Sequence, residues 1–203
     1  MRKTRVWIRS KMDKKLFITF VIVLLLGLAS CVKSNSVTTS KTINQDPLEK
    51  IYNSDPQRRF IGQAIEETEH PLKDIVSGKT YTLNELKGKP VIIETFSVGC
   101  PACAEGIKNY NYIYDKYKDK VTIIYLNINP YDTEENIMGI KNQYNGKDWI
   151  WVKFDENLKP FLDKYNLVGN DVTLILDKND KIVYADSLAA PVSRIENSII
   201  KVI

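Results

Sequence analysis

Apolar residues gather in short runs along most of the chain, and segments with helical spacing separate these runs. The two longest runs, 90–97 and 121–128, are nearly continuous, which is typical of strands covered on both faces of a sheet. Shorter runs predict further strands at 79–83, 149–154, 172–176 and 181–185. Helical segments are expected at 84–88, 100–118, 133–144, 157–165 and 191–202. This order of elements indicates an α/β fold with a central mixed sheet flanked by helices.

Polar residues and a glycine mark several ends of these elements. Gly88 closes the predicted turn at 84–88, and Asp132 or Thr133 is a suitable N-cap for the helix that follows. The segment 177–180, Asp-Lys-Asn-Asp, lies between two predicted strands. Such a polar cluster between apolar runs is typical of a hairpin. The last two strands are therefore expected to pair antiparallel.

The first 31 residues have the pattern of an export signal. Seven Lys/Arg and one acidic residue precede an apolar run at 16–28, which is too short for a spanning helix of about 20 apolar residues. The run leads into Leu28-Ala29-Ser30-Cys31, which resembles a bacterial lipobox. That resemblance implies lipidation of Cys31, which would become the mature N-terminus. The alternative is an uncleaved signal anchor, and in either case the rest of the chain is expected outside the cytoplasm and tethered to a membrane.

Without the leader, the charge of the chain changes sign. The whole sequence has a net charge of +4, but residues 1–30 carry seven of the 29 basic residues and one of the 25 acidic ones. The remainder is therefore at −2, and nothing in it suggests nucleic-acid binding. The predicted organisation is a signal peptide at 1–30, a lipidated N-terminus and polar spacer at 31–55, and one domain at 56–203.

The segment 90–103 carries the most informative chemistry. A buried strand leads directly into Cys100-Pro101-Ala102-Cys103 at the start of a predicted helix. A helix N-terminus stabilises a thiolate, the form of cysteine that attacks disulfides. A C-x-x-C pair is also half of a zinc site, but the other soft ligands are Cys31 in the leader and His70, the single histidine. A haem attachment motif would need histidine where Ala104 stands.

The chain resembles the thioredoxin superfamily, in particular the membrane-tethered TlpA/ResA-like branch near the AhpC/TSA redoxins. The resemblance spans about 60–203 and rests on Ser77-Gly78-Lys79, on Leu86-Lys87-Gly88-Lys89-Pro90 before the strand, on Cys100-Pro101-Ala102-Cys103, and on Leu174-Ile175-Leu176-Asp177. It implies a thioredoxin-like fold, with Cys100 as the exposed nucleophile and Cys103 as the buried resolving thiol of a redox-active disulfide.

Glu94, six residues before Cys100, stands where thioredoxin has a buried acid. Burial raises the pKa of a carboxyl, which can then accept the proton of Cys103 when this thiol resolves a mixed disulfide. Strand alternation leaves a second option, in which Glu94 points to a solvated rim. Because both faces of a parallel sheet are usually covered, we expect Glu94 to be buried and catalytic.

The sequence departs from the family pattern at three places. Gly99 stands where a tryptophan is usual, and Gly106 and Lys108 replace a helical glutamate and a kinking proline. The largest departure is the loop Asn170-Asp171, where the family has a cis-proline that packs against the dithiol, binds peptide backbone and helps to exclude metals. A cis peptide without proline costs about 2.5–4 kcal/mol, so a trans Asn170–Asp171 bond is expected. If Asp171 faces the dithiol, its charge is expected to raise the pKa of Cys100.

These features predict an exported, lipid-anchored thiol–disulfide oxidoreductase. Its partners would be protein thiols and disulfides and a separate recycling redox protein, since no dinucleotide or phosphate motif indicates a cofactor. A peroxidase is disfavoured because Ile93 and Ser97 replace the proline and threonine of the peroxidase motif. A copper or zinc chaperone, with a nearby His70 or with Asp171 as substitute ligand, and an inactive thioredoxin-like binding protein remain alternatives.

Overall fold

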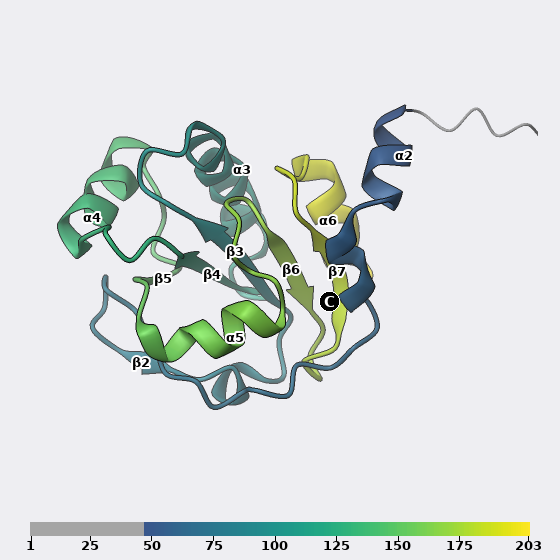
Figure 1. Ribbon diagram of the computed structural model, residues 1–203, viewed down its shortest axis with the longest axis horizontal. Helices are drawn as coiled ribbons and strands as arrows, with labels where there is room; N and C mark the ends of the chain where they lie inside the picture. The colour runs from purple at the N-terminus through teal and green to yellow at the C-terminus, as the bar shows by residue number, and fades with distance from the viewer. Residues whose placement is uncertain (1–46) are drawn as a thin grey trace, which may run out of the picture. The chain divides into compact units, whose positions relative to one another are not determined.

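The computed structural model describes residues 47–203, and its centre is a five-stranded sheet (Figure 1). The strand order is β5-β4-β3-β6-β7. The first three strands in this order are parallel to one another, and β6 pairs antiparallel with both β3 and β7. The predicted mixed sheet is confirmed. Its strands are β3 (Val91–Phe96), β4 (Thr122–Asn127), β5 (Ile150–Val152), β6 (Thr173–Leu176) and β7 (Ile182–Asp186).

Helices cover both faces of this sheet, so the domain has an apolar cluster on each side (Figure 1). On one side lie α3 (Pro101–Tyr117), α4 (Glu134–Gln143) and α6 (Val192–Ile200). On the other lie α5 (Lys159–Lys164) and the 3-10 helices η1 (Pro56–Phe60) and η3 (Glu156–Leu158). Burial on both faces explains why β3 and β4 lack a polar–apolar alternation.

Alternation along β3 assigns its side chains to the two clusters. Val91 and Ile93 pack with the α5 side, whereas Ile92 and Phe96 pack with the α3 side, where Cys103 also lies. Because successive side chains of a strand point to opposite faces, Glu94 shares the face of Ile92 and Phe96. The strand thus carries an acid on the same side as the helix that begins with the dithiol.

The smaller elements differ in detail from those expected. A two-stranded antiparallel sheet pairs β1 (Leu72–Lys73) with β2 (Thr80–Tyr81), shorter than the strand predicted at 79–83. The turn η2 (Asn84–Leu86) precedes Gly88, whose φ of +96° suits glycine. The helix predicted at 157–165 is divided into η3 and α5, with Pro160 in the first turn of α5. Within residues 47–203, no helix combines the length and apolar character needed to cross a bilayer.

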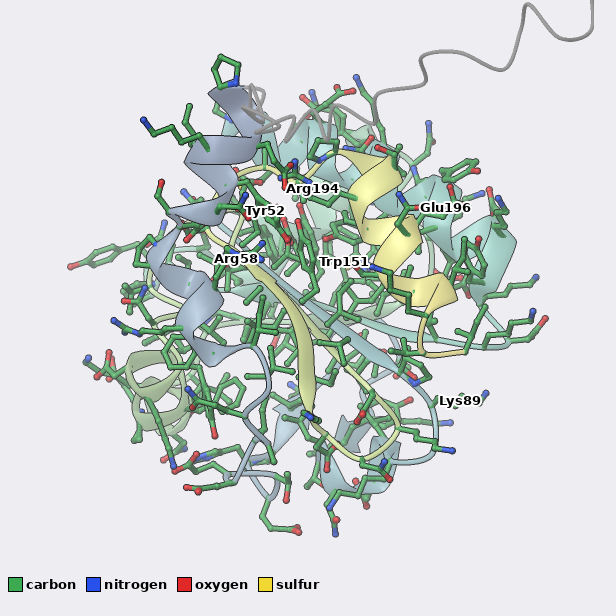
Figure 2. The ribbon with its side chains drawn as sticks, turned by 90° about the vertical axis from the view of Figure 1, so that its right-hand side faces the viewer. Tyr52, Arg58, Lys89, Trp151, Arg194 and Glu196 are labelled. Atoms are coloured by element: carbon green, nitrogen blue, oxygen red, sulfur yellow. A yellow bond between two sulfur atoms is a disulfide. The ribbon has the colours of Figure 1, made fainter. Side chains whose placement is uncertain are left out.

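The structure also differs from the expected spacer at 31–55. Its last part forms α2 (Pro47–Asn53), and the compact unit that contains it spans Gln45–Ile203. Tyr52 of α2 contacts two guanidinium groups, those of Arg58 at 4.0 Å and Arg194 at 3.7 Å from its ring centroid (Figure 2). Asp55 accepts hydrogen bonds from the backbone and hydroxyl of Ser187. These long-range contacts attach residues 47–55 to the domain, which hydropathy alone did not indicate.

Candidate active site

The two cysteines lie at the point where β3 ends and α3 begins. Cys100 is the N-cap of α3, and its Sγ accepts a hydrogen bond from the backbone N–H of Cys103 at 3.1 Å. Pro101 takes the first helical position, where its missing N–H costs little. The two sulfurs form a disulfide, with Cys100 partly exposed and Cys103 fully buried. The two sulfurs therefore differ in their access to solvent.

Side chains that the sequence did not identify as part of the site hold the loop before Cys100 in place. Asp132 accepts a hydrogen bond from the backbone N–H of Val98 at 2.7 Å and another from the Asn127 side chain at 2.7 Å. Gly99 has a φ of +85°, which a side chain such as tryptophan would adopt only with strain. Thr133, and not Asp132, is the N-cap of α4. Asp132 therefore orients the active-site loop.

Glu94 is buried beneath the dithiol helix, with 3% of its surface exposed. The alternative of a solvated rim is therefore wrong. Its Oε2 accepts hydrogen bonds from the Tyr110 hydroxyl at 2.9 Å and from the Thr173 hydroxyl. Burial raises the pKa of Glu94 to about 8; the two hydrogen bonds oppose this shift and the charge of Asp171 adds to it. A carboxyl with such a pKa can take up or release a proton near neutral pH.

Thr95 fixes the loop that contains Asn170 and Asp171. Its hydroxyl donates to the carbonyl of Gly169 at 2.6 Å and accepts from the N–H of Val172 at 2.9 Å, while its carbonyl accepts from the N–H of Asp171. Among the described residues there is no cis peptide bond, in agreement with the expected trans Asn170–Asp171 bond. Asp171 has a φ of +59°, a left-handed conformation that Asp and Asn tolerate better than most residues.

This conformation directs the Asp171 carboxylate at the dithiol. Its Oδ2 lies 3.6 Å from Sγ of Cys100, although 71 positions separate the two residues in the sequence. Burial raises the pKa of the Asp171 carboxyl. The absence of a side chain at Gly106 leaves room here, since a Cβ would lie 3.9 Å from Oδ1 of Asp171 and 3.3 Å from the Tyr125 hydroxyl. Asp171 is thus a neighbour of the thiols, as the resemblance suggested.

Two hollows flank the dithiol. One, of about 330 Å³, is lined by the acids Glu94, Glu105 and Asp171, together with Gly106 and Tyr110. The other, of about 640 Å³, lies on the α4 side and includes Cys100 in its lining. The first hollow borders the two buried carboxyls, and the second borders the partly exposed sulfur of Cys100.

The remaining candidates fall outside this cluster. His70 packs against Phe161 of α5, on the opposite face of the sheet from α3. Cys31 lies outside the described residues, as do the predicted signal peptide and most of the spacer. Among residues 47–203, one group of three potential metal ligands occurs, formed by Cys100, Cys103 and Asp171.

Sequence reasoning missed Thr95, Tyr110, Thr173 and Asp132 as members of the site. Tyr110 and Thr173 are neutral residues within regular elements, and a hydroxyl there has no distinctive pattern. Thr173 directly opposes Glu94 in the pairing of β6 with β3, but only the fold shows this register, because no hairpin connects these two strands.

Comparisons with known proteins agree with this geometry. A model of the AhpC/TSA family matches residues 61–185. The thiol-disulfide oxidoreductase ResA of Bacillus cereus is 31% identical over 112 residues, which cover 53% of this chain and 60% of that protein. The matched segment therefore spans less than two thirds of this relative.

Solved structures show the same architecture. A putative thiol:disulfide interchange protein DsbE from Chlorobium tepidum aligns with a TM-score of 0.60 at 16% identity, covering 70% of this chain and 98% of that one. The thioredoxin domain of a thiol-disulfide oxidoreductase from Bacteroides vulgatus aligns with a TM-score of 0.56 at 24% identity, over 68% and 95% of the two chains. These likenesses confirm the predicted thioredoxin-like fold.

Proposed function

The chain belongs to the AhpC/TSA family, and from this premise we propose that it is a thiol–disulfide oxidoreductase acting on other proteins through Cys100 and Cys103. The observation that carries the proposal is the disulfide at the N-terminus of α3, with one sulfur accessible and the other buried beside an acid-lined hollow. Similarity to the ResA relative supports the same activity. The surface of the mature chain, at a net charge of −2, supports a protein substrate over a nucleic acid.

In the first step, the thiolate of reduced Cys100 attacks one sulfur of a substrate disulfide. The new bond joins Cys100 to the substrate, the substrate S–S bond breaks, and the second substrate sulfur leaves as a thiolate that takes a proton. The helix N-terminus and the N–H of Cys103 favour the Cys100 thiolate. The nearby carboxylate of Asp171 opposes it, so that the pKa of Cys100 reflects both effects.

In the second step, Cys103 loses its proton and attacks Sγ of Cys100. The mixed disulfide breaks, the substrate leaves fully reduced, and the Cys100–Cys103 disulfide forms. Glu94 is the proposed acceptor of the Cys103 proton, because its raised pKa suits a base in a buried site and it lies on the sheet face that α3 covers. A separate protein must return two electrons to the disulfide.

The test separates the two steps with Glu94→Gln. Alkylation of Cys100 measures the first step, and release of product from a preformed mixed disulfide with a model peptide measures the second. We expect the variant to slow the second step by about a hundredfold or more, the lower end of what a general base supplies, and to leave alkylation nearly unchanged. Glu105→Gln, which removes an exposed acid of α3, the helix that carries Cys103, is the matched control. Equal slowing of both steps would contradict the role of Glu94, and failure to turn over any disulfide substrate would contradict the function itself.

The cellular setting is also part of the proposal. The leader and Cys31 support an exported protein anchored in the membrane by lipid on Cys31, facing outside the cytoplasm. Substrates would then be proteins of the cell envelope. Mass spectrometry of the mature N-terminus tests this directly, because lipidation adds the mass of two or three acyl chains to the cysteine.

A further inference from the structure

Three potential ligand atoms meet where α3 begins and the 170–171 loop passes. The sulfurs of Cys100 and Cys103 and a carboxylate oxygen of Asp171 all lie within 4.8 Å of one another. Tetrahedral zinc has bonds of about 2.3 Å to sulfur and about 2.0 Å to oxygen, which places adjacent sulfur and oxygen ligands about 3.5 Å apart. The separation between Sγ of Cys100 and Oδ2 of Asp171 is 3.6 Å. The distance between this sulfur and this oxygen is therefore close to the one that zinc requires.

The Asp171 carboxylate gives a second, independent indication of a ligand. Its side chain is 7% exposed, and its Oδ1 is buried without a hydrogen-bond partner among the described residues. Buried polar atoms are nearly always paired, because an unpaired one costs about 1–3 kcal/mol. Thr95 nevertheless holds the loop in the conformation that aims this carboxylate at the thiols. A cation bound by the thiols would give the carboxylate a partner.

We propose that the reduced protein binds one zinc ion through the thiolates of Cys100 and Cys103 and the carboxylate of Asp171. Two thiolates and one carboxylate are a ligand set for zinc, whereas copper(I) prefers sulfur alone and magnesium or calcium require oxygen. The fourth position takes water from the hollow that Asp171 lines. Binding releases two thiol protons to solvent and transfers no electrons.

Zinc and the disulfide exclude one another, because both use the same two sulfurs. Zinc binding therefore stabilises the dithiol and makes it a weaker reductant. Above the dissociation constant, each tenfold rise in free zinc is expected to raise the reduction potential by about 30 mV, the tenfold equivalent for a two-electron couple. Zinc binding by the reduced chain rests on the same sulfurs as the proposed exchange activity, but it is tested apart from that activity, which a disulfide-reduction assay without metal measures.

The experiment uses the full chain in detergent, reduced and free of metal. Zinc is titrated against a chromophoric chelator, and cobalt(II) is used as a spectroscopic substitute. Wild type is expected to bind one equivalent of zinc when reduced and none when oxidised, with cobalt giving sulfur charge-transfer bands and tetrahedral d–d bands. Absence of zinc uptake by the reduced chain, or equal uptake by the oxidised chain, would overturn the proposal.

Asp171→Asn tests the third ligand. Asparagine adopts the same left-handed backbone, so the loop is expected to persist while the anionic ligand is lost. Zinc affinity should fall at least tenfold and the cobalt d–d bands should change, whereas copper(I) affinity should stay within about threefold because copper(I) prefers the sulfurs. Glu105→Gln, on the rim of the same hollow, should bind zinc as wild type does. Equal zinc affinity in Asp171→Asn and wild type would exclude Asp171 from the site.

Discussion

Glu94 is expected to make the stability of this protein depend on pH in an unusual direction. In the folded protein the pKa of its carboxyl is about 8, against 4.5 for an unperturbed glutamate. The folded state therefore binds a proton more tightly than the unfolded chain does. The corresponding stability is fully present below pH 4.5 and is lost as the pH rises through 8.

The size of this effect follows from the two pKa values. Between pH 4.5 and pH 8 the free energy of unfolding should fall by about 1.4 kcal/mol for each pH unit, or about 5 kcal/mol over the whole window. This is a large share of the roughly 5–15 kcal/mol by which a domain is usually stable. Ionisation of a buried Glu94 therefore lowers the stability of the protein considerably. Such a destabilising carboxyl is consistent with a functional role for its proton.

Glu94→Gln removes the titration but keeps most of the packing. The glutamine carbonyl can still accept hydrogen bonds from Tyr110 and Thr173, and its amide group faces the hollow beside Asp171. Urea unfolding of the oxidised protein at several pH values between 4.5 and 8.5 measures the difference. The variant should gain stability relative to wild type steadily with pH and should be the more stable protein at pH 8.

Glu105→Gln again provides the control, because it makes the same chemical change at an exposed position of α3. Its unfolding free energy should follow that of wild type at every pH. If the difference between Glu94→Gln and wild type is the same at pH 4.5 and at pH 8, the carboxyl does not have a raised pKa. The assignment of Glu94 as a base near neutral pH would then fail with it.

Three further predictions concern the loop, the thiol and the anchor. Thr95→Val should lower the free energy of unfolding by about 1–3 kcal/mol in urea titrations, because it leaves buried groups of the 169–172 loop unpaired; an unchanged midpoint would contradict this. Asp171→Asn should lower the pKa of Cys100 in alkylation rates measured against pH, since a negative charge 3.6 Å from the sulfur is removed. Cys31→Ser should abolish acylation of the N-terminus in mass spectra, and acyl chains on another residue would refute the predicted anchor.

Local sequence patterns were sufficient to predict the main strands and helices of the domain and the candidate reactive dithiol. Continuous apolar runs predicted β3 and β4, and the C-x-x-C spacing at a helix start predicted the dithiol, because both depend on contacts between residues close in the chain. The spacing of Glu94 from Cys100 was also sufficient to place an acid on the strand that leads to the site. These features are local, and local propensity is what sequence patterns record.

How distant residues complete the site is visible only in the folded chain. Tyr110 and Thr173 surround Glu94 because α3 covers the face of β3 on which the acid lies and because β6 pairs with β3 in one register. The positive φ of Asp171 then turns its carboxylate to a sulfur 71 positions away. The register between β3 and β6, the packing of α3 on the sheet and the conformation of the 170–171 loop arise from the packing of the whole chain. No stretch of sequence specifies them by itself. The same holds for Tyr52, whose contacts with two arginines bring α2 onto the domain.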